Sequence, residues 1–249
     1  MQPLISIITP NYNCEKFIEA TIQSVRNQSY RNWEWYIIDD GSKDKSIEII
    51  ESYCKLDSRI KLFKSAINQG PAKCRNKGIE LAKGNFMTFI DSDDIWLPEF
   101  LKTSLSFVKK SEGFVFASYH RYDENLQPKY RDFIVPLKVT YADILKTNSI
   151  SCLTAFINIE KLGKLYMPNV RYRQDMGLWL SYLKKIPYAI GNQTPLAIYR
   201  IRENSHSRNK LNLLKHQWQF YRKVEKLSVF KSAYYFVLWM IYGFIKYAN

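Results

Sequence analysis

Three carboxylates, Asp91, Asp93 and Asp94, stand within four residues directly after an apolar run at 86–90 that has the composition of a buried strand. Carboxylates at this spacing repel one another, so they need a cation or full solvation to stay ionised together. Hard cations such as Mg²⁺ take one or two carboxylates together with the phosphates of a substrate. The cluster therefore indicates a divalent metal holding a phosphorylated ligand. The alternative is that the acids cap a following helix, which Pro98 would help to begin.

The elements around this cluster predict a fold that would gather such residues. Apolar and amphipathic runs predict strands at 4–8, 33–38, 60–63 and 86–90, and helices at 17–25, 44–54 and 72–82. This alternation is typical of an α/β fold with a largely parallel sheet. Because parallel strands end at one edge of a sheet, the loops 9–13, 39–42 and 91–94 should meet there. Their convergence favours a ligand site over simple helix capping.

The second half of the chain has a less regular pattern and contains no internal repeat. Its composition predicts helices at 101–109, at 141–147 and from Asp175 onward, and strands at 114–119, 133–135, 153–159 and 196–200. The last forty residues have a helical and basic composition.

Composition limits the class of protein. With 249 residues, 46% hydrophobic and 15% aromatic, the chain can build one large domain with or without an appendage. The net charge of +14 is compatible with nucleic acid, an anionic membrane or a phosphorylated substrate as partner. Residues 200–249 contribute +8 of it, from ten Lys or Arg and two acids.

The four cysteines and three histidines show no spacing typical of zinc sites. A reduced, intracellular chain is the simplest interpretation of the cysteines. The N-terminus lacks the pattern of a secretion signal, so we expect the protein to stay in the cytoplasm.

Five motifs carry a resemblance to a known family: IITPNYN at 7–13, IDDGS at 38–42, Arg75 within 72–78, DSDD at 91–94, and QD at 174–175. In this order they resemble the family 2 glycosyltransferases, over about residues 4–205. The resemblance implies the GT-A fold, an α/β fold with a mostly parallel central sheet flanked by helices, here with a C-terminal helical extension. It also implies inverting sugar transfer from a nucleotide sugar, with Mn²⁺ or Mg²⁺ as cofactor. Residues 152–209 are most similar to enzymes that build bacterial surface polysaccharides of the teichuronic acid or lipopolysaccharide type, which implies a UDP-sugar donor and a lipid-linked saccharide acceptor.

The resemblance implies that five residues bind the donor's nucleoside and diphosphate. Thr9, Pro10 and Tyr12 would hold the nucleoside, with Tyr12 packed on the base. Asp40 would accept a hydrogen bond from the uracil N–H, a role that suits a carboxylate because it only accepts. Arg75 would bind the diphosphate bidentately. The alternatives are that Tyr12 and Asp40 are only turn residues and that Arg75 lies on a solvated helix face.

The same resemblance makes Asp93 the metal ligand. Asp91 and Asp94 would assist it, one of them by binding the ribose. Ser92 would lie in the same donor-binding loop. The metal would neutralise charge on the departing diphosphate. Many relatives have a histidine where this chain has Arg202. An arginine can bring charge to the diphosphate but cannot ligate a metal.

Asp175 is the expected catalytic base, because inverting displacement needs one carboxylate to take the proton of the acceptor hydroxyl. Its neighbour is Gln174, where the family usually has Glu. The alternative is that Asp175 only favours the start of a helix. A nucleotidyltransferase would share the sheet and the metal, but it would need basic residues in the loop 9–13, which has none. A degenerate, membrane-bound scaffold is the non-enzymatic alternative.

The predicted organisation is a GT-A domain at 1–205, with a nucleotide-binding half at 1–98 and an acceptor-binding half at 99–205, followed by a tail at 206–249. The tail joins a basic, aromatic helix to the uncharged run 232–245, which is too short to span a bilayer. This pattern suits the interface of an anionic membrane on the cytoplasmic side. The alternative is packing on the domain itself or on a partner chain. Nucleic acid is not expected, since no known reading module is present.

Overall fold

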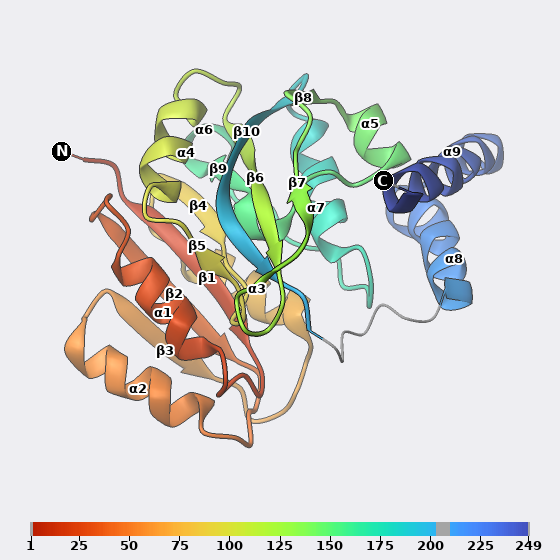
Figure 1. Cartoon of the computed structure of the whole chain (residues 1–249). Coiled ribbons are helices and arrows are strands. Elements are labelled where there is room, and N and C mark those ends of the chain that lie inside the picture. The colour runs from red at the N-terminus through yellow and green to blue at the C-terminus, as the bar shows by residue number, and fades with distance from the viewer. Residues whose placement is uncertain (1, 203–209, 249) are drawn as a thin grey trace.

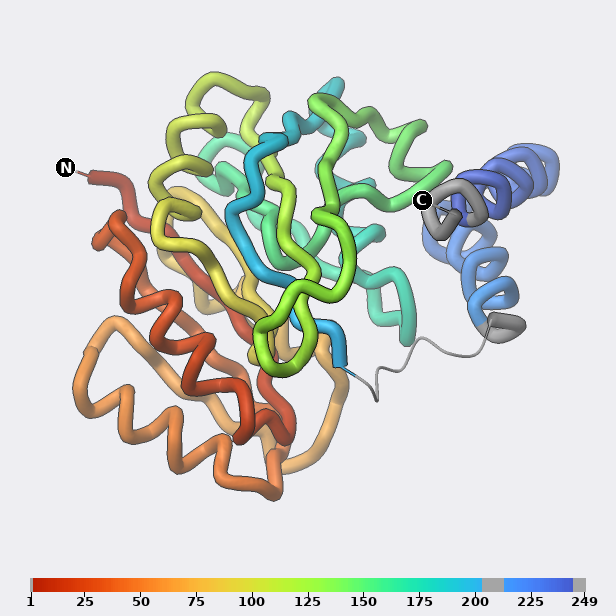
Figure 2. The backbone as a smooth tube through the Cα atoms, in the orientation of Figure 1, coloured from red at the N-terminus to blue at the C-terminus, as the bar shows by residue number. Residues whose placement is uncertain are grey.

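The computed structural model describes residues 2–202 and 210–248. These residues form one ten-stranded sheet covered by helices, with two C-terminal helices beside it (Figure 1). The strand order is β3-β2-β1-β4-β9-β6-β10-β5, with β7 paired to β6 and β8 to β10. The N-terminal part of the chain, red to orange, and the C-terminal part, green to blue, lie on opposite sides of the molecule (Figure 2).

The first half alternates strands and helices, as its hydrophobic pattern predicts. Its elements are β1 (Ile5–Asn11), α1 (Ile18–Arg26), β2 (Trp33–Asp39), α2 (Ser46–Leu56), β3 (Ile60–Lys64), α3 (Pro71–Leu81), β4 (Phe86–Phe89) and β5 (Ile95–Trp96). The neighbours β3, β2, β1 and β4 are all parallel. β1 is longer than expected, because its pairing with β2 continues through residues 9–11, where we predicted a turn.

The second half contains the remaining strands, the acceptor-side helices and the tail. Its elements are α4 (Phe100–Val108), β6 (Phe114–Tyr122), β7 (Pro128–Phe133), β8 (Lys138–Val139), α5 (Tyr141–Lys146), a 3₁₀ turn (Cys152–Thr154), β9 (Phe156–Asn158), α6 (Ile159–Leu162), α7 (Gln174–Leu183), β10 (Ala189–Arg200), α8 (Lys210–Gln219), a π-helical turn (Phe220–Val224) and α9 (Val229–Ala248). Here the sheet is mixed: β9 runs antiparallel between β4 and β6, whereas β10 is parallel to β6.

Three predicted strands of this half differ from the structure. β10 begins at Ala189, well before the predicted start at 196, and register shifts on both sides of Pro195 fit the proline into the long strand. The predicted strand 153–159 is divided into a 3₁₀ turn, a short strand and the first turn of α6. The strand expected at 133–135 lies at 128–133, where it is mostly exposed. An exposed strand has no apolar run to mark it.

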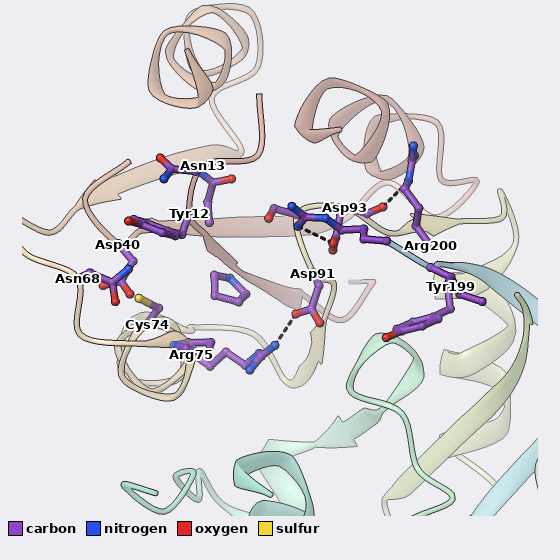
Figure 3. A pocket seen from close by; sticks show the side chains of 16 residues that line it. Tyr12, Asn13, Asp40, Asn68, Cys74, Arg75, Asp91, Asp93, Tyr199 and Arg200 are labelled. Atoms are coloured by element: carbon purple, nitrogen blue, oxygen red, sulfur yellow. Dashed lines mark hydrogen bonds and ion pairs between the residues drawn. The ribbon is translucent and has the colours of Figure 1, made fainter. Parts of the chain in front are cut away.

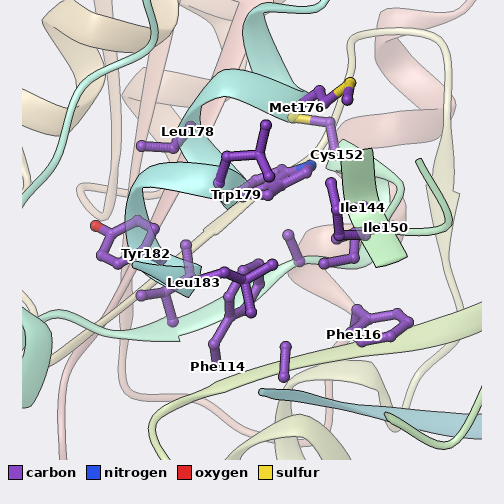
Figure 4. Close-up of a cluster of buried hydrophobic side chains, with 14 of the residues drawn as sticks. Phe114, Phe116, Ile144, Ile150, Cys152, Met176, Leu178, Trp179, Tyr182 and Leu183 are labelled. Carbon is purple, nitrogen blue, oxygen red and sulfur yellow. The ribbon is translucent and has the colours of Figure 1, made fainter. Parts of the chain in front are cut away.

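Two apolar cores fill the opposite faces of the sheet. Alternate residues of β1 point to opposite faces, so that Ile7 joins the core under α1 and α2, while Ile8 joins the core under α3 and α7. Figure 4 shows part of the second core, where Phe114 and Trp179 lie with their ring centroids 5.3 Å apart. At Gly78 a Cβ atom would lie 2.4 Å from Ile8 Cγ2, so glycine permits the close approach of α3 to β1. That approach positions the first turns of α3 beside the ends of β1 and β4.

The predicted C-terminal helical extension is present as α8 and α9. No helix in residues 2–202 and 210–248 combines the length and apolarity that crossing a membrane requires. The predicted boundary at 205 falls in 203–209, outside the described residues, and the division at 98 stays a prediction.

Candidate functional site

A cavity of about 660 Å³ opens where β1, β2, β4 and β10 end (Figure 3). The residues that line it are Pro10, Asn11, Tyr12, Asn13, Asp40, Asn68, Pro71, Cys74, Arg75, Asp91, Ser92, Asp93, Tyr199, Arg200, Ile201 and Arg202. All the residues predicted to bind donor or metal are among them, except Thr9 and Asp94. The convergence of loops inferred from the parallel strands is therefore present.

The end of β1 divides its polar residues between the cavity and the core. Pro10 and Tyr12 line the cavity, and Tyr12 is 48% exposed, so that its ring is open to a ligand. Thr9 is completely buried and its hydroxyl accepts a hydrogen bond from Trp35 Nε1 at 2.9 Å. The structure thus places Thr9 in the core between β1 and β2, away from the cavity.

The two acids at the end of β2 have different surroundings. Asp39 is fully buried and accepts hydrogen bonds from the backbone N–H groups of Gly41 and Ser42, which fixes the turn. Asp40 lines the cavity, and its two carboxylate oxygens accept from Gln69 N at 2.8 Å and Gly70 N at 2.7 Å. Asp40 therefore holds the loop before α3 against the end of β2.

Arg75 of α3 points toward Asp91, and its Nη2 lies 2.5 Å from Asp91 Oδ1 (Figure 3). The Arg75 side chain is only 10% exposed, so it does not belong to a solvated helix face. Burial acts to lower the pKa of Arg75, but the carboxylate of Asp91, with smaller contributions from Cys152 and Asp175, raises it above its ordinary value. The guanidinium is a permanent positive charge at the floor of the cavity.

Asp93 is paired with a second arginine. Its Oδ2 lies 3.1 Å from Arg202 Nη1, and the Asp93 side chain is 21% exposed. Burial and the neighbouring charge of Asp91 raise the pKa of Asp93, although Arg202 opposes the shift. The ion pair with Arg202 therefore offsets only part of the cost of burying this carboxylate.

Asp94 is buried and does not line the cavity. It is 1% exposed, and its Oδ1 accepts a hydrogen bond from the backbone N–H of Arg200 at 2.8 Å. Burial and the charges of Asp93 and Asp91 raise the pKa of Asp94 well above its ordinary value. The structure does not bring Asp94 into the cavity, so it does not support our expectation that this residue assists at the metal or ribose. Nor do these acids cap the next helix, since the short strand β5 separates them from α4.

Arg200 is a site residue that we did not predict. Its Nε donates to the backbone oxygen of Asp93 at 2.7 Å, and its Nη1 donates to the backbone oxygen of Glu124 at 2.8 Å. The guanidinium carbon lies 4.7 Å from the ring centroid of Phe17. Arg200 thus connects its own strand, the loop at Glu124 and the ring of Phe17 to the acidic loop. An arginine at the end of a predicted strand was the available signal, but it does not reveal such distant partners.

The predicted base, Asp175, lies in the first turn of α7, as expected, and is not among the residues that line the cavity. Its Oδ2 accepts a hydrogen bond from Asn148 Nδ2 at 3.1 Å. It contributes to the raised pKa of Arg75, so its carboxylate lies near enough to act on that arginine electrostatically. The helix begins after Arg173, whose left-handed backbone (φ 64°) turns the chain into α7.

Asp91 and Asp93 are the residues that could hold a divalent cation. In the part of the chain that the structure describes, no three His, Cys, Asp or Glu side chains gather as a complete metal site. Mg²⁺ commonly uses only one or two carboxylates and completes its shell with water and substrate phosphates. Two partly exposed carboxylates that line one cavity fit that mode of binding.

Solved structures with low sequence identity share this fold. The Staphylococcus aureus protein TarS, residues 1–349 in complex with UDP-GlcNAc, matches with a TM-score of 0.73 and 21% identity over 95% of this chain and 71% of that one. The mannosyltransferase PcManGT from Pyrobaculum calidifontis, in complex with GDP-Man and Mn²⁺, matches with a TM-score of 0.70 and 16% identity over 92% of this chain and 66% of that one. The predicted GT-A fold is thereby confirmed.

Sequence comparison gives the family. A protein of Bacillus subtilis named for teichuronic acid biosynthesis, the glycosyltransferase TuaG, is 41% identical over 95% of this chain and 94% of its own length. The Escherichia coli UDP-Glc:alpha-D-GlcNAc-diphosphoundecaprenol beta-1,3-glucosyltransferase WfgD is 35% identical over 98% of this chain and 95% of its own length. The family model "Glycosyl transferase family 2" matches residues 6–162, more than half of the sequence, and the chain belongs to this family of glycosyltransferases.

Proposed function

We propose that this glycosyltransferase transfers a sugar, with inversion, from a UDP-sugar to a lipid-linked saccharide during the synthesis of a bacterial surface polysaccharide. The observation that carries the proposal is the cavity in which acids and arginines alternate at the ends of parallel strands. The names of TuaG and WfgD support the polysaccharide class and the lipid-linked acceptor. TarS, solved with UDP-GlcNAc, supports a UDP-linked donor.

The donor's nucleoside would lie between Tyr12 and Asp40. Each oxygen of Asp40 accepts one backbone N–H and retains a second lone pair, so it can also accept the N–H of uracil. Pro10 and the exposed ring of Tyr12 provide an apolar surface for the base. The diphosphate would then reach the two arginines, Arg75 and Arg202, beside Ser92.

Asp91 and Asp93 would hold Mn²⁺ or Mg²⁺ together with the diphosphate oxygens. When bound, the cation supplies Lewis-acid stabilisation of the leaving diphosphate. Arg75 and Arg202 add fixed positive charge at the same place, and charge that is already in position requires no rearrangement during the reaction.

Asp175 would act as the general base from the opposite side. It takes the proton of the acceptor hydroxyl, whose oxygen forms the new bond to the anomeric carbon while the bond from that carbon to the diphosphate oxygen breaks. The electron pair of the broken bond leaves with the nucleoside diphosphate, and attack from the opposite face inverts the anomeric centre. Asn148 holds the Asp175 carboxylate through Oδ2 and leaves Oδ1 for the incoming hydroxyl. A lipid-linked acceptor would place the reaction at the cytoplasmic face of the plasma membrane.

The Asp175→Asn variant tests this assignment, since it preserves shape and removes the base. We expect release of UDP from a panel of UDP-sugars, with membrane lipid extract as acceptor and Mn²⁺ present, to fall by about 10²–10⁴-fold. Affinity for UDP, measured by calorimetry, should not change, and Glu48→Gln, at an exposed position on α2, is the matched control. Full activity of Asp175→Asn would refute its role as base. UDP binding by the wild type without any sugar transfer would favour the scaffold alternative.

A further inference from the structure

Helix α9 packs on the protein through one of its faces. Ser232 is fully buried, and Phe236 contacts Trp218 of α8 with their rings perpendicular and their centroids 5.7 Å apart. Trp239, on the same face, lies 5.3 Å from the guanidinium of Arg173, directly before α7. The packed face therefore fixes α9 to α8 and to the segment that leads into Asp175.

The opposite face of α9 is also apolar, and within the described residues it is largely exposed. Phe230 is 88% exposed, Tyr234 60%, Val237 49% and Ile241 48%. Their spacing of four, three and four residues places them in one row, roughly opposite the packed face at about 3.6 residues per turn. We name this row the outer stripe. Single exposed apolar residues are common, whereas a continuous row on one helix marks an interaction surface.

The charge around the outer stripe identifies what it can contact. Between residues 213 and 243 the sequence has one acid, Glu225, and five Lys or Arg: Lys215, Arg222, Lys223, Lys226 and Lys231. The Glu225 side chain is 2% exposed and is held by Lys184 Nζ at 2.7 Å. Exposed Lys226 precedes α9 and exposed Lys231 lies in its first turn, so the two lysines flank Phe230 in the sequence. Two copies of this surface would repel each other, whereas an anionic surface would attract it.

We propose that the outer stripe and its lysines bind the surface of an anionic lipid bilayer, with α9 lying in the plane of the interface. Aromatic and aliphatic side chains would enter the boundary between headgroups and acyl chains, and the lysines would contact anionic headgroups. On its packed face α9 contacts Arg173 through Trp239, and this contact joins the helix to the start of α7. At this point the inference rests on the proposed function, because the docked orientation would bring Asp175 near acceptors held in the membrane.

Vesicle flotation with the full-length chain, without donor or acceptor, tests the proposal independently of sugar transfer. We expect binding to mixed phosphatidylcholine and phosphatidylglycerol vesicles and little binding to pure phosphatidylcholine. Phe230→Ser with Tyr234→Ser should lower the partition coefficient by about tenfold or more, since buried aromatic area is lost. Leu56→Ser, at a 71% exposed position on α2, should leave it unchanged.

The charge contribution needs its own variant and control. Lys226→Glu with Lys231→Glu should also lower the partition coefficient by about tenfold or more. The same double reversal at the exposed residues Lys43 and Lys55, which alters net charge equally, should have a much smaller effect. Thermal unfolding confirms that each variant is folded.

Three results would overturn the proposal: no binding to anionic vesicles, equal binding after the stripe substitutions, or a dimer in sedimentation experiments that Phe230→Ser dissociates. The last would assign the stripe to a second copy of the chain. Vesicle binding by a protein that transfers no sugar would uphold this inference and refute the proposed function.

Discussion

Replacing Arg200 by methionine would remove the guanidinium that links the acidic loop to the rest of the site. In the wild type this group bridges the backbone oxygens of Asp93 and Glu124, and the Arg200 backbone N–H binds Asp94. Methionine keeps the length and much of the apolar stem, but it leaves both carbonyl groups without these donors. The substitution therefore tests whether the loop depends on one buried side chain.

The structure sets the size of the effect. Hydrogen bonds from a charged donor contribute about 1.5–3 kcal/mol each, so two of them amount to roughly 3–6 kcal/mol. Against this, Arg200 is 6% exposed, its Nη2 has no partner among the described residues, and burial lowers its pKa. Removing a buried charge recovers part of that desolvation cost. We expect a net loss of about 2 kcal/mol in the free energy of unfolding, or roughly 4–8 °C in Tm for a chain of this size.

Urea unfolding followed by tryptophan fluorescence measures the stability, and calorimetry with UDP and Mn²⁺ measures the ligand site. Affinity for UDP should fall by about tenfold or more, because Asp93 is displaced when its backbone partner is lost. Arg200→Lys keeps the charge but cannot bridge both carbonyl groups, so its values should be intermediate. Arg131→Met, at an exposed position on β7, is the control. If Arg200→Met matches Arg131→Met in both measurements, the bridging role is refuted.

Two further predictions concern the fold. Burial acts to raise the pKa of Glu34, but hydrogen bonds from Lys83 N, Ser6 Oγ, Tyr36 OH and Lys61 Nζ lower it below its ordinary value of 4.5. A lowered folded-state pKa stabilises the protein above pH 4.5 and this contribution is lost as the pH falls. Urea titrations from pH 7 to 3 should therefore show a smaller loss of stability for Glu34→Gln than for wild type or Glu48→Gln, and parallel curves would contradict this. Gly191→Ala would place a Cβ atom 2.1 Å from the backbone oxygen of Pro136, so it should lower the free energy of unfolding in urea by about 1–3 kcal/mol. A Cβ atom at Gly243 meets nothing within 4 Å, so Gly243→Ala should be neutral or stabilising. Equal effects of the two substitutions would refute the steric argument.

The alternating first half could be predicted because its strands are buried on both faces and its helices are amphipathic. Such elements show their period directly in the sequence. The long strand β10 could not be predicted, since its polar stretch with Pro195 resembles a turn and is held in the sheet by pairing with β6. The exposed strand β7 likewise depends on pairing with β6 and carries no apolar pattern.

For the site, parallel strand ends were sufficient to gather Asp40 and the 91–94 loop, but not to orient individual side chains. Thr9 points into the core, where its hydroxyl accepts a hydrogen bond from Trp35 of a neighbouring strand. Arg200 was missed for the same reason: its partners lie 107 and 76 residues away along the chain. Long-range hydrogen bonds of this kind leave no local pattern in the sequence.

The acidic cluster shows how charge and geometry together determine the roles of residues. Three carboxylates in four residues require compensating positive charge, and within the described residues this charge comes from arginines. Arg75 pairs with Asp91 and Arg202 pairs with Asp93, while the Arg200 backbone binds Asp94. Yet the pKa of Asp93 stays above its ordinary value because burial and Asp91 outweigh Arg202. The arginine pairs therefore offset only part of the cost of burying Asp93, and under the proposed function a divalent cation held by Asp91 and Asp93 would add to this compensation where the nucleotide sugar brings its diphosphate.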